Sequence, residues 1–238
     1  MIIGGLEKFS LIDYPEHLSA IVFTKGCNFR CQFCYNPMLV WPDQSAKTNN
    51  EDHSYIEEND LLVFLRSRIG KLDAVVVTGG EPTLHADLPE FLAGIKKLGF
   101  KIKLDSNGTN PEMLKTVIDQ ELVDYLAMDI KAAPQKYDLA TGVQPDMEKI
   151  KESIKIIKNS GLPYEFRTTV VPELATVKDI SEMGEMISGA DKWYLQKFKS
   201  DTALVNRDFE NFKAYADDDM QAMREIAKNY AKICEIRG

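Results

Sequence analysis

Three absences narrow what this chain can be. No apolar run approaches the roughly eighteen residues needed to cross a bilayer, and residues 1–8 lack the charged and apolar regions of a signal peptide. The formal net charge is −8, and 29 lysines and arginines are scattered among 37 acids, so there is no broad basic surface for nucleic acid. We therefore expect a cytoplasmic protein that binds neither membrane nor nucleic acid.

Cysteine is also scarce, yet three of the four cysteines are clustered as Cys27-x3-Cys31-x2-Cys34. In a reducing compartment, clustered cysteines more often bind metal or do redox chemistry than form disulfides. Three thiolates can hold three corners of an iron–sulfur cube and leave the fourth iron open to a small molecule. The alternative is a structural zinc site closed by Cys234, because structural zinc is four-coordinate. Without that role, Cys234 is expected to be a buried thiol on the last helix.

The hydrophobic pattern alternates between buried strands and amphipathic helices. It predicts strands over residues 19–24, 73–78, 100–104, 124–130, 164–171 and 193–198. It predicts helices over residues 59–68, 87–98, 111–120, 146–159, 177–187 and 218–236, with irregular regions at 43–58 and 206–219. This alternation indicates an α/β fold with a parallel sheet, and five or six βα units in one domain favour a partial (β/α)6 barrel.

Polar residues follow the ends of these predicted strands, where parallel barrels place their chemistry. They are Gly79, Gly80 and Glu81 after the second strand, Asp105 and Ser106 after the third, Asp129 and Lys131 at the fourth, and Arg167 in the fifth. Each group has a plainer alternative. Residues 79–81 and 105–106 could form simple turns, Asp129 and Lys131 could be solvated charges, and Arg167 could form a salt bridge. Their shared position predicts that they converge at one edge of the fold.

The cysteine motif, with Phe33 before its last cysteine and the run Gly79-Gly80-Glu81-Pro82 after the next strand, resembles the radical S-adenosylmethionine (SAM) superfamily. The stretches GLEKFSLIDYPEHLSAIVFTKGCNFRCQFCYNP, TGGEPTL, DSNGT and YLAMDIKA resemble glycyl-radical-enzyme activases, above all those of anaerobic ribonucleoside-triphosphate reductase. The resemblance implies one radical SAM domain, with a core over about residues 17–200 and a helical extension over residues 201–238.

The resemblance also implies cofactors and a reaction. Cys27, Cys31 and Cys34 would bind a [4Fe–4S] cluster, with Phe33 beside the cofactors, and SAM would chelate the open iron. A low-potential donor such as flavodoxin or ferredoxin would supply the electron that cleaves SAM to methionine and a 5′-deoxyadenosyl radical. That radical would take a hydrogen atom from a glycine Cα of a partner enzyme, for which anaerobic ribonucleotide reductase is expected.

The same resemblance implies roles for the residues at the strand ends. For SAM it names Gly79, Gly80 and Glu81 at the methionyl amine, Asp105 and Ser106 at the ribose, and Arg167 at the carboxylate. Asp129 and Lys131 match an Asp-x-Lys element of the activases, near the cofactor and the partner's glycine loop. The signs of charge agree, because a carboxylate suits an ammonium and a guanidinium suits a carboxylate.

Two departures from the activase pattern are informative. Tyr35 follows the third cysteine, where activases often have histidine. Activases of pyruvate formate-lyase carry a histidine on the last barrel strand, whereas His17, His53 and His85 all lie in the first 85 residues here, which weighs against that partner. Three alternatives stay open: a radical SAM enzyme acting on a small molecule, an activase of another glycyl-radical enzyme, and a zinc-stabilised binding protein without catalysis.

Overall fold

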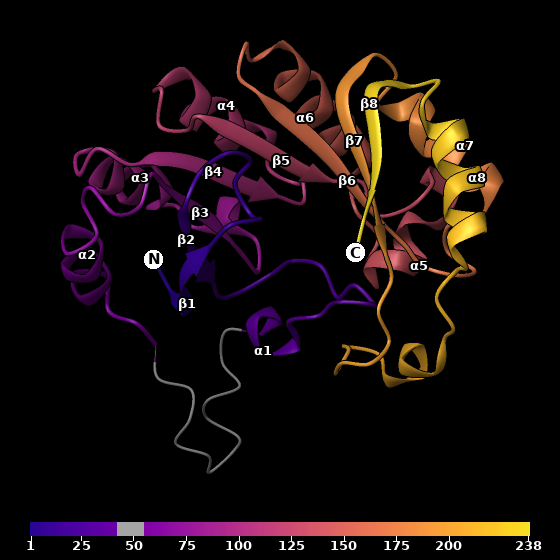
Figure 1. Cartoon of the computed structure of the whole chain (residues 1–238), viewed down its shortest axis with the longest axis horizontal. Coiled ribbons are helices and arrows are strands. Elements are labelled where there is room, and N and C mark those ends of the chain that lie inside the picture. The colour runs from indigo at the N-terminus through magenta and orange to yellow at the C-terminus, as the bar shows by residue number, and fades with distance from the viewer. Residues whose placement is uncertain (42–54) are drawn as a thin grey trace. The chain divides into compact units, whose positions relative to one another are not determined.

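The computed structural model describes residues 1–41 and 55–238 (Figure 1). Within these ranges eight strands form a mostly parallel sheet in the order β1 to β8. They are β1 (Ile3–Ser10), β2 (Ser19–Thr24), β3 (Ala74–Gly79), β4 (Lys101–Ser106), β5 (Tyr125–Asp129), β6 (Tyr164–Val170), β7 (Ala190–Lys197) and β8 (Ala231–Arg237). β1 runs antiparallel to β2, whereas the pairs β2–β3, β3–β4, β6–β7 and β7–β8 are parallel. The predicted α/β class is confirmed, and β2 to β7 correspond to the six predicted βα strands.

Helices alternate with these strands. They are α1 (Pro37–Val40), α2 (Glu58–Arg66), α3 (Leu88–Lys96), α4 (Pro111–Asp119), α5 (Tyr137–Thr141), α6 (Met147–Asn159), α7 (Val177–Met186) and α8 (Asp217–Ala227), with 3-10 turns η2 (Pro82–Leu84), η3 (Pro134–Lys136) and η4 (Arg207–Asn211). Side chains fix several starts: Asp146 accepts from the Glu148 amide, and Thr176 and Asp179 form a reciprocal capping box. In the described part of the chain, none of the helices is long and apolar enough to cross a bilayer.

The chain falls into two compact units. Unit 1 comprises residues 1–28, 38–106 and 112–126, and unit 2 comprises residues 29–37, 107–111 and 127–238. The irregular region predicted over residues 43–58 lies mostly outside the described residues. The second one, 206–219, contains η4 and the start of α8. The single domain of the radical SAM type stays a prediction.

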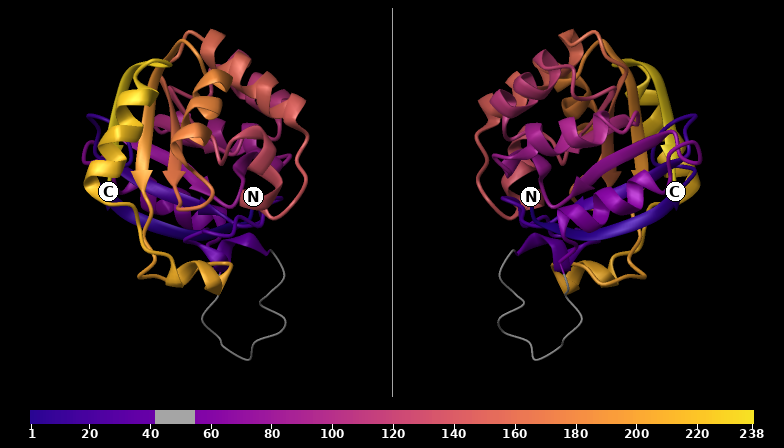
Figure 2. Two further views of the ribbon diagram at one scale, coloured as in Figure 1. Left: turned by 90° about the vertical axis from the view of Figure 1, so that its right-hand side faces the viewer. Right: turned by 90° about the vertical axis from the view of Figure 1, so that its left-hand side faces the viewer.

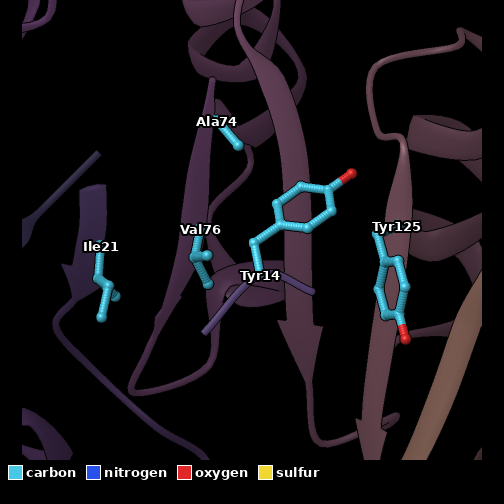
Figure 3. Close-up of a cluster of buried hydrophobic side chains, with 5 residues drawn as sticks. All are labelled: Tyr14, Ile21, Ala74, Val76 and Tyr125. Atoms are coloured by element: carbon cyan, nitrogen blue, oxygen red, sulfur yellow. The ribbon is translucent and has the colours of Figure 1, made fainter. Parts of the chain in front are cut away.

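The core of unit 1 includes an aromatic residue from the link between β1 and β2. Tyr14 is 4% exposed and packs with Ile21, Ala74, Val76 and Tyr125 (Figure 3). The centroids of the Tyr14 and Tyr125 rings are 5.6 Å apart. Burial, with a smaller contribution from the Asp124 charge, raises the pKa of Tyr14 to about 12. Tyr14, in the stretch SLIDYP (residues 10–15), is therefore part of the core and anchors the residues that precede it.

The helix predicted over residues 218–236 is wrong beyond Ala227. The chain turns there and forms β8, parallel to β7, and α8 packs along both strands, as Figure 2 (left) shows. The C-terminal segment is therefore not only helical, and Cys234 is buried on a strand rather than on a helix. β1 was not predicted either: its sequence IGGLEKFS has glycines at the second and third positions and is half exposed, so it lacks the apolar pattern of a buried strand.

β8 is tied to its neighbours by a forked ion pair. Arg237 donates from both terminal nitrogens to the Glu165 carboxylate of β6, at 3.1 Å each, and its guanidinium lies 3.3 Å from the Tyr194 ring centroid of β7. Glu165 is 1% exposed. A buried carboxylate needs such a partner, because an uncompensated charge is costly in a protein interior.

Arg237→Ala is therefore expected to lower the free energy of unfolding by about 3 kcal/mol, the low end of the range for breaking a buried ion pair, since Arg237 is itself partly exposed. Lys232→Ala is the matched control. It removes an ion pair of the same strand with Asp191, but both side chains are exposed, so no measurable change is expected. Urea unfolding of the two variants makes the comparison, and equal midpoints would contradict the prediction.

Candidate functional site

In unit 1, the turn after β3 lies directly against the backbone after β2. The Gly80 amide donates to the Thr24 carbonyl and the Glu81 amide to the Gly26 carbonyl, both at 2.8 Å. A Cβ on Gly80 would lie 2.1 Å from the Gly26 oxygen, and one on Gly79, whose φ is +114°, would lie 2.4 Å from the Thr24 nitrogen. Both positions thus require glycine for backbone packing alone, so the plain turn explains these residues without a ligand.

The carboxylate of Glu81 is buried at this turn, with 1% of the residue exposed. Its Oε1 accepts from the Thr83 amide at 3.1 Å, the Thr83 hydroxyl at 2.5 Å and the Ser106 hydroxyl at 2.9 Å. Ser106 ends β4, so the structure brings together two of the residues predicted to share an edge. These donors fix the orientation of a buried acid.

Asp105, next to Ser106, forms a buried ion pair that the sequence interpretation missed. Lys103 Nζ lies 2.6 Å from Asp105 Oδ1, and 2% and 9% of the two side chains are exposed. The Lys103 ammonium also lies 6.0 Å from the Tyr125 ring centroid. Residues two apart on a strand share a face, so the spacing of Lys103 and Asp105 was the available signal.

The first cysteine, Cys27, follows Gly26, whose carbonyl accepts from the Glu81 amide of the turn after β3. Its amide donates to the Val40 carbonyl at 3.1 Å, and the Gly26 amide donates to the Leu39 carbonyl at 2.8 Å, so α1 holds the backbone here. The Cys27 side chain is half-buried. Thr24, which ends β2 beside Gly79 in the strand register, has a buried hydroxyl without a hydrogen-bond partner in the described protein. That hydroxyl is a polar atom that a bound group could satisfy.

The other two clustered cysteines belong to unit 2. The Cys34 amide donates to the Cys31 carbonyl at 3.1 Å. α5 holds the loop from one side, because the Thr141 and Ala140 carbonyls accept from the Arg30 and Gln32 amides at 2.7 and 3.1 Å. Cys31 and Phe33 are buried and Cys34 is half-buried. Burial raises the pKa of the Cys31 thiol to about 11, against a lowering effect of the Lys131 charge.

Asp129 of unit 2 is held by two cations. Arg167 Nε lies 2.9 Å from its Oδ1, and Lys131 Nζ lies 3.0 Å from its Oδ2. The Ile130 amide donates to the Arg167 carbonyl at 2.8 Å, which aligns the two strand ends. Burial raises the pKa of Asp129, but Arg167 and Lys131 outweigh it and hold that pKa below its usual range. Burial likewise lowers the pKa of Lys131, but Asp129 outweighs it, so Lys131 stays cationic at neutral pH.

The roles of these residues toward a cofactor stay predictions. Asp129, Lys131 and Arg167 come together, and Arg167 forms the salt bridge that was its plainer alternative. In residues 1–41 and 55–238, no three His, Cys, Asp or Glu side chains gather around a position for one metal ion. The donor set nevertheless fits a [4Fe–4S] cluster, because each thiolate of a cluster binds its own iron and the three need not converge on one ion.

Comparison with known proteins adds sequence relatives. The profile described as "Radical SAM superfamily" matches residues 21–186. A Methanocaldococcus jannaschii protein named "Putative glycyl-radical enzyme activating enzyme" is 32% identical over 241 residues, covering 99% of this chain and 95% of its own length. A pyruvate formate-lyase-activating enzyme of Listeria monocytogenes is 32% identical over 143 residues, covering 57% of this chain and 55% of its own.

Solved structures share the fold at lower identity. A domain of a pyruvate-formate lyase-activating enzyme from Bacteroides vulgatus has a TM-score of 0.57 and 19% identity, and the match covers 70% of this chain and 99% of that one. Streptococcus suis SuiB bound to S-adenosylmethionine has a TM-score of 0.64 and 17% identity, with 92% of this chain and 52% of that chain covered.

Proposed function

Because the chain belongs to the radical SAM superfamily, we propose that it activates a glycyl-radical enzyme, with anaerobic ribonucleoside-triphosphate reductase as its partner. Membership makes it an enzyme whose cofactors are a [4Fe–4S] cluster and SAM. The observation that carries the proposal is the 32% identity to the archaeal protein named as an activating enzyme, because it extends over 99% of the chain rather than over the superfamily core alone.

The chain's own residues would bind and orient the cofactors. Cys27, Cys31 and Cys34 each offer one thiolate to the cluster. When bound, the cluster would supply the electron for the cleavage of SAM, the chemistry by which a hydrogen atom would be removed from the partner's glycine. Glu81, already oriented by Thr83 and Ser106, offers its carboxylate to the methionyl ammonium.

The Asp129 cluster would serve the anionic end of SAM. Asp129 holds Arg167 and Lys131 in place, and these two cations suit a carboxylate ligand such as that of the methionyl group. Asp129 and Lys131 also lie in the YLAMDIKA stretch that resembles activases, which supports a role of these two residues near the partner's glycine loop. Phe33, buried in the cysteine loop, would add an apolar wall beside the cofactors.

The choice of partner rests on the resemblance and on the missing histidine of β7. Within the stretch SLIDYP (residues 10–15), Leu11 and Ile12 are 65% and 85% exposed, so apolar side chains are available to a protein partner. Because some relatives are named as pyruvate formate-lyase-activating enzymes, pyruvate formate-lyase is the second candidate for the partner. The donor, flavodoxin or ferredoxin, and the cytoplasmic location stay predictions.

The test is reductive activation of a purified anaerobic ribonucleotide reductase. With SAM and reductant, we expect the doublet of a glycyl radical in the electron paramagnetic resonance (EPR) spectrum of the reductase, and no comparable signal with pyruvate formate-lyase.

Asp129→Asn and Lys131→Ala should lower the radical yield several-fold at unchanged iron content. A full yield in both variants would reject the role of the pair. Turnover of a free metabolite, with no radical on either enzyme, would reject the activase.

A further inference from the structure

Tyr35, the residue that departs from the activase pattern, contacts the segment after β7. Its hydroxyl oxygen accepts a hydrogen bond from the Lys199 amide at 2.9 Å. Its ring stacks on Phe198, with centroids 6.4 Å apart and an interplanar angle of 23°. Phe198 is 1% exposed, so this contact anchors Tyr35 to the core of unit 2.

Gln32 makes a second contact with the same segment. The Asn206 amide donates to the Gln32 carbonyl at 3.0 Å, and Asn206 Nδ2 donates to Gln32 Oε1 at 2.8 Å. Asn206 is itself held, because its Oδ1 accepts from the Asp208 amide at the start of η4. Both the backbone and the side chain of Gln32 are thus engaged by one residue.

The contacts of Gln32 and Tyr35 flank Cys34 in the sequence. Between them, residues 200–204 of the segment line an open pocket of about 490 Å³ together with Pro37, Arg207 and Glu210. The segment therefore lines this pocket, with Tyr35 bonded near one of its ends and Gln32 near the other. Residues 198–206 lie beyond the part of the chain that matches the superfamily profile, which ends at residue 186.

We propose that Tyr35 and Gln32 are positioning residues that use the segment 198–206 to hold the Cys34 thiol ready for its iron. The inference rests on the proposed cluster ligation. A ligand loop that is ordered before the metal binds loses less conformational entropy on binding and releases the metal more slowly. Hydrogen bonds around a cluster and its exposure to water also set its reduction potential.

The test compares Tyr35→Phe and Asn206→Ala with Tyr164→Phe. The control removes a hydroxyl of the same kind in the same unit, since Tyr164 accepts from the Asp191 amide at 3.0 Å. In the protein without its cluster, hydrogen exchange of the Lys199 amide should be about tenfold faster in Tyr35→Phe than in the wild type, because the variant lacks the one hydrogen bond that this amide donates to Tyr35. After reconstitution, Tyr35→Phe and Asn206→Ala should release iron to a chelator several-fold faster than the control, with a shifted cluster EPR spectrum.

The outcomes separate this inference from the proposed function. Iron release and EPR spectra equal to those of Tyr164→Phe would overturn the positioning role, even if exchange at Lys199 rises. A wild-type protein that takes up no iron would instead overturn the cluster ligation, and with it the inference.

Discussion

Replacing Cys31 with alanine is expected to reduce the iron content of the anaerobically purified protein from about four atoms per chain to none. Cys27→Ala and Cys34→Ala should have the same effect, because each thiolate binds a different iron and a cluster with two protein ligands is not retained. Iron analysis and the visible spectrum measure the result. The brown colour of the wild type should be absent from all three variants.

Cys234→Ala is the matched control for this series. Cys234 is 4% exposed on β8, and burial raises the pKa of its thiol to about 11, with the charge of Arg224 acting in the opposite direction. A buried, protonated thiol of this kind is inert, so the variant should keep about four irons. Loss of iron in Cys234→Ala, or stoichiometric zinc in the wild type, would support a closed zinc site instead.

Much of the fold follows from local pattern. Residues 19–24 were predicted as a strand and form β2 with the same bounds, because a short, largely apolar run between turn residues is typical of a strand buried on both faces. β8 could not be found in this way. Met220, Met223, Ala227, Ala231 and Cys234 are all buried and spaced three or four apart, which mimics one helical face across the turn after α8.

The candidate site was predictable in its residues but not in its pairings. That Glu81 and Ser106 share an edge follows from parallel strands ending together. Asp129 forms ion pairs with both Arg167 and Lys131 because β5 and β6 are aligned in one particular way. The hydrogen bond from the Ile130 amide to the Arg167 carbonyl fixes this alignment. A sequence does not specify such alignment residue by residue, because non-local packing sets it.

Gly80→Ala is expected to be among the most destabilising single changes in unit 1. The new Cβ would meet the Gly26 carbonyl oxygen at 2.1 Å and its carbon at 2.7 Å, and backbone atoms cannot move away as a flexible side chain can. Relief of the clash requires the turn to leave the Thr24–Gly26 backbone, which breaks the hydrogen bonds that the Gly80 and Glu81 amides donate to it. Overpacking and two lost hydrogen bonds together correspond to about 3 kcal/mol or more.

The matched control is Gly94→Ala, on α3. A Cβ there has no atom within 4 Å, so alanine should raise stability by up to about 1 kcal/mol through its higher helix propensity. Chemical unfolding of the two variants separates backbone packing from a general glycine effect. If Gly80→Ala unfolds like the wild type and only its SAM affinity falls, the glycine serves the approach of the ligand and the contact with Gly26 is not what requires it. If the stability and the SAM affinity of Gly80→Ala fall together, the glycine is required for backbone packing, and Glu81 reaches its place only because Gly80 lets the turn close.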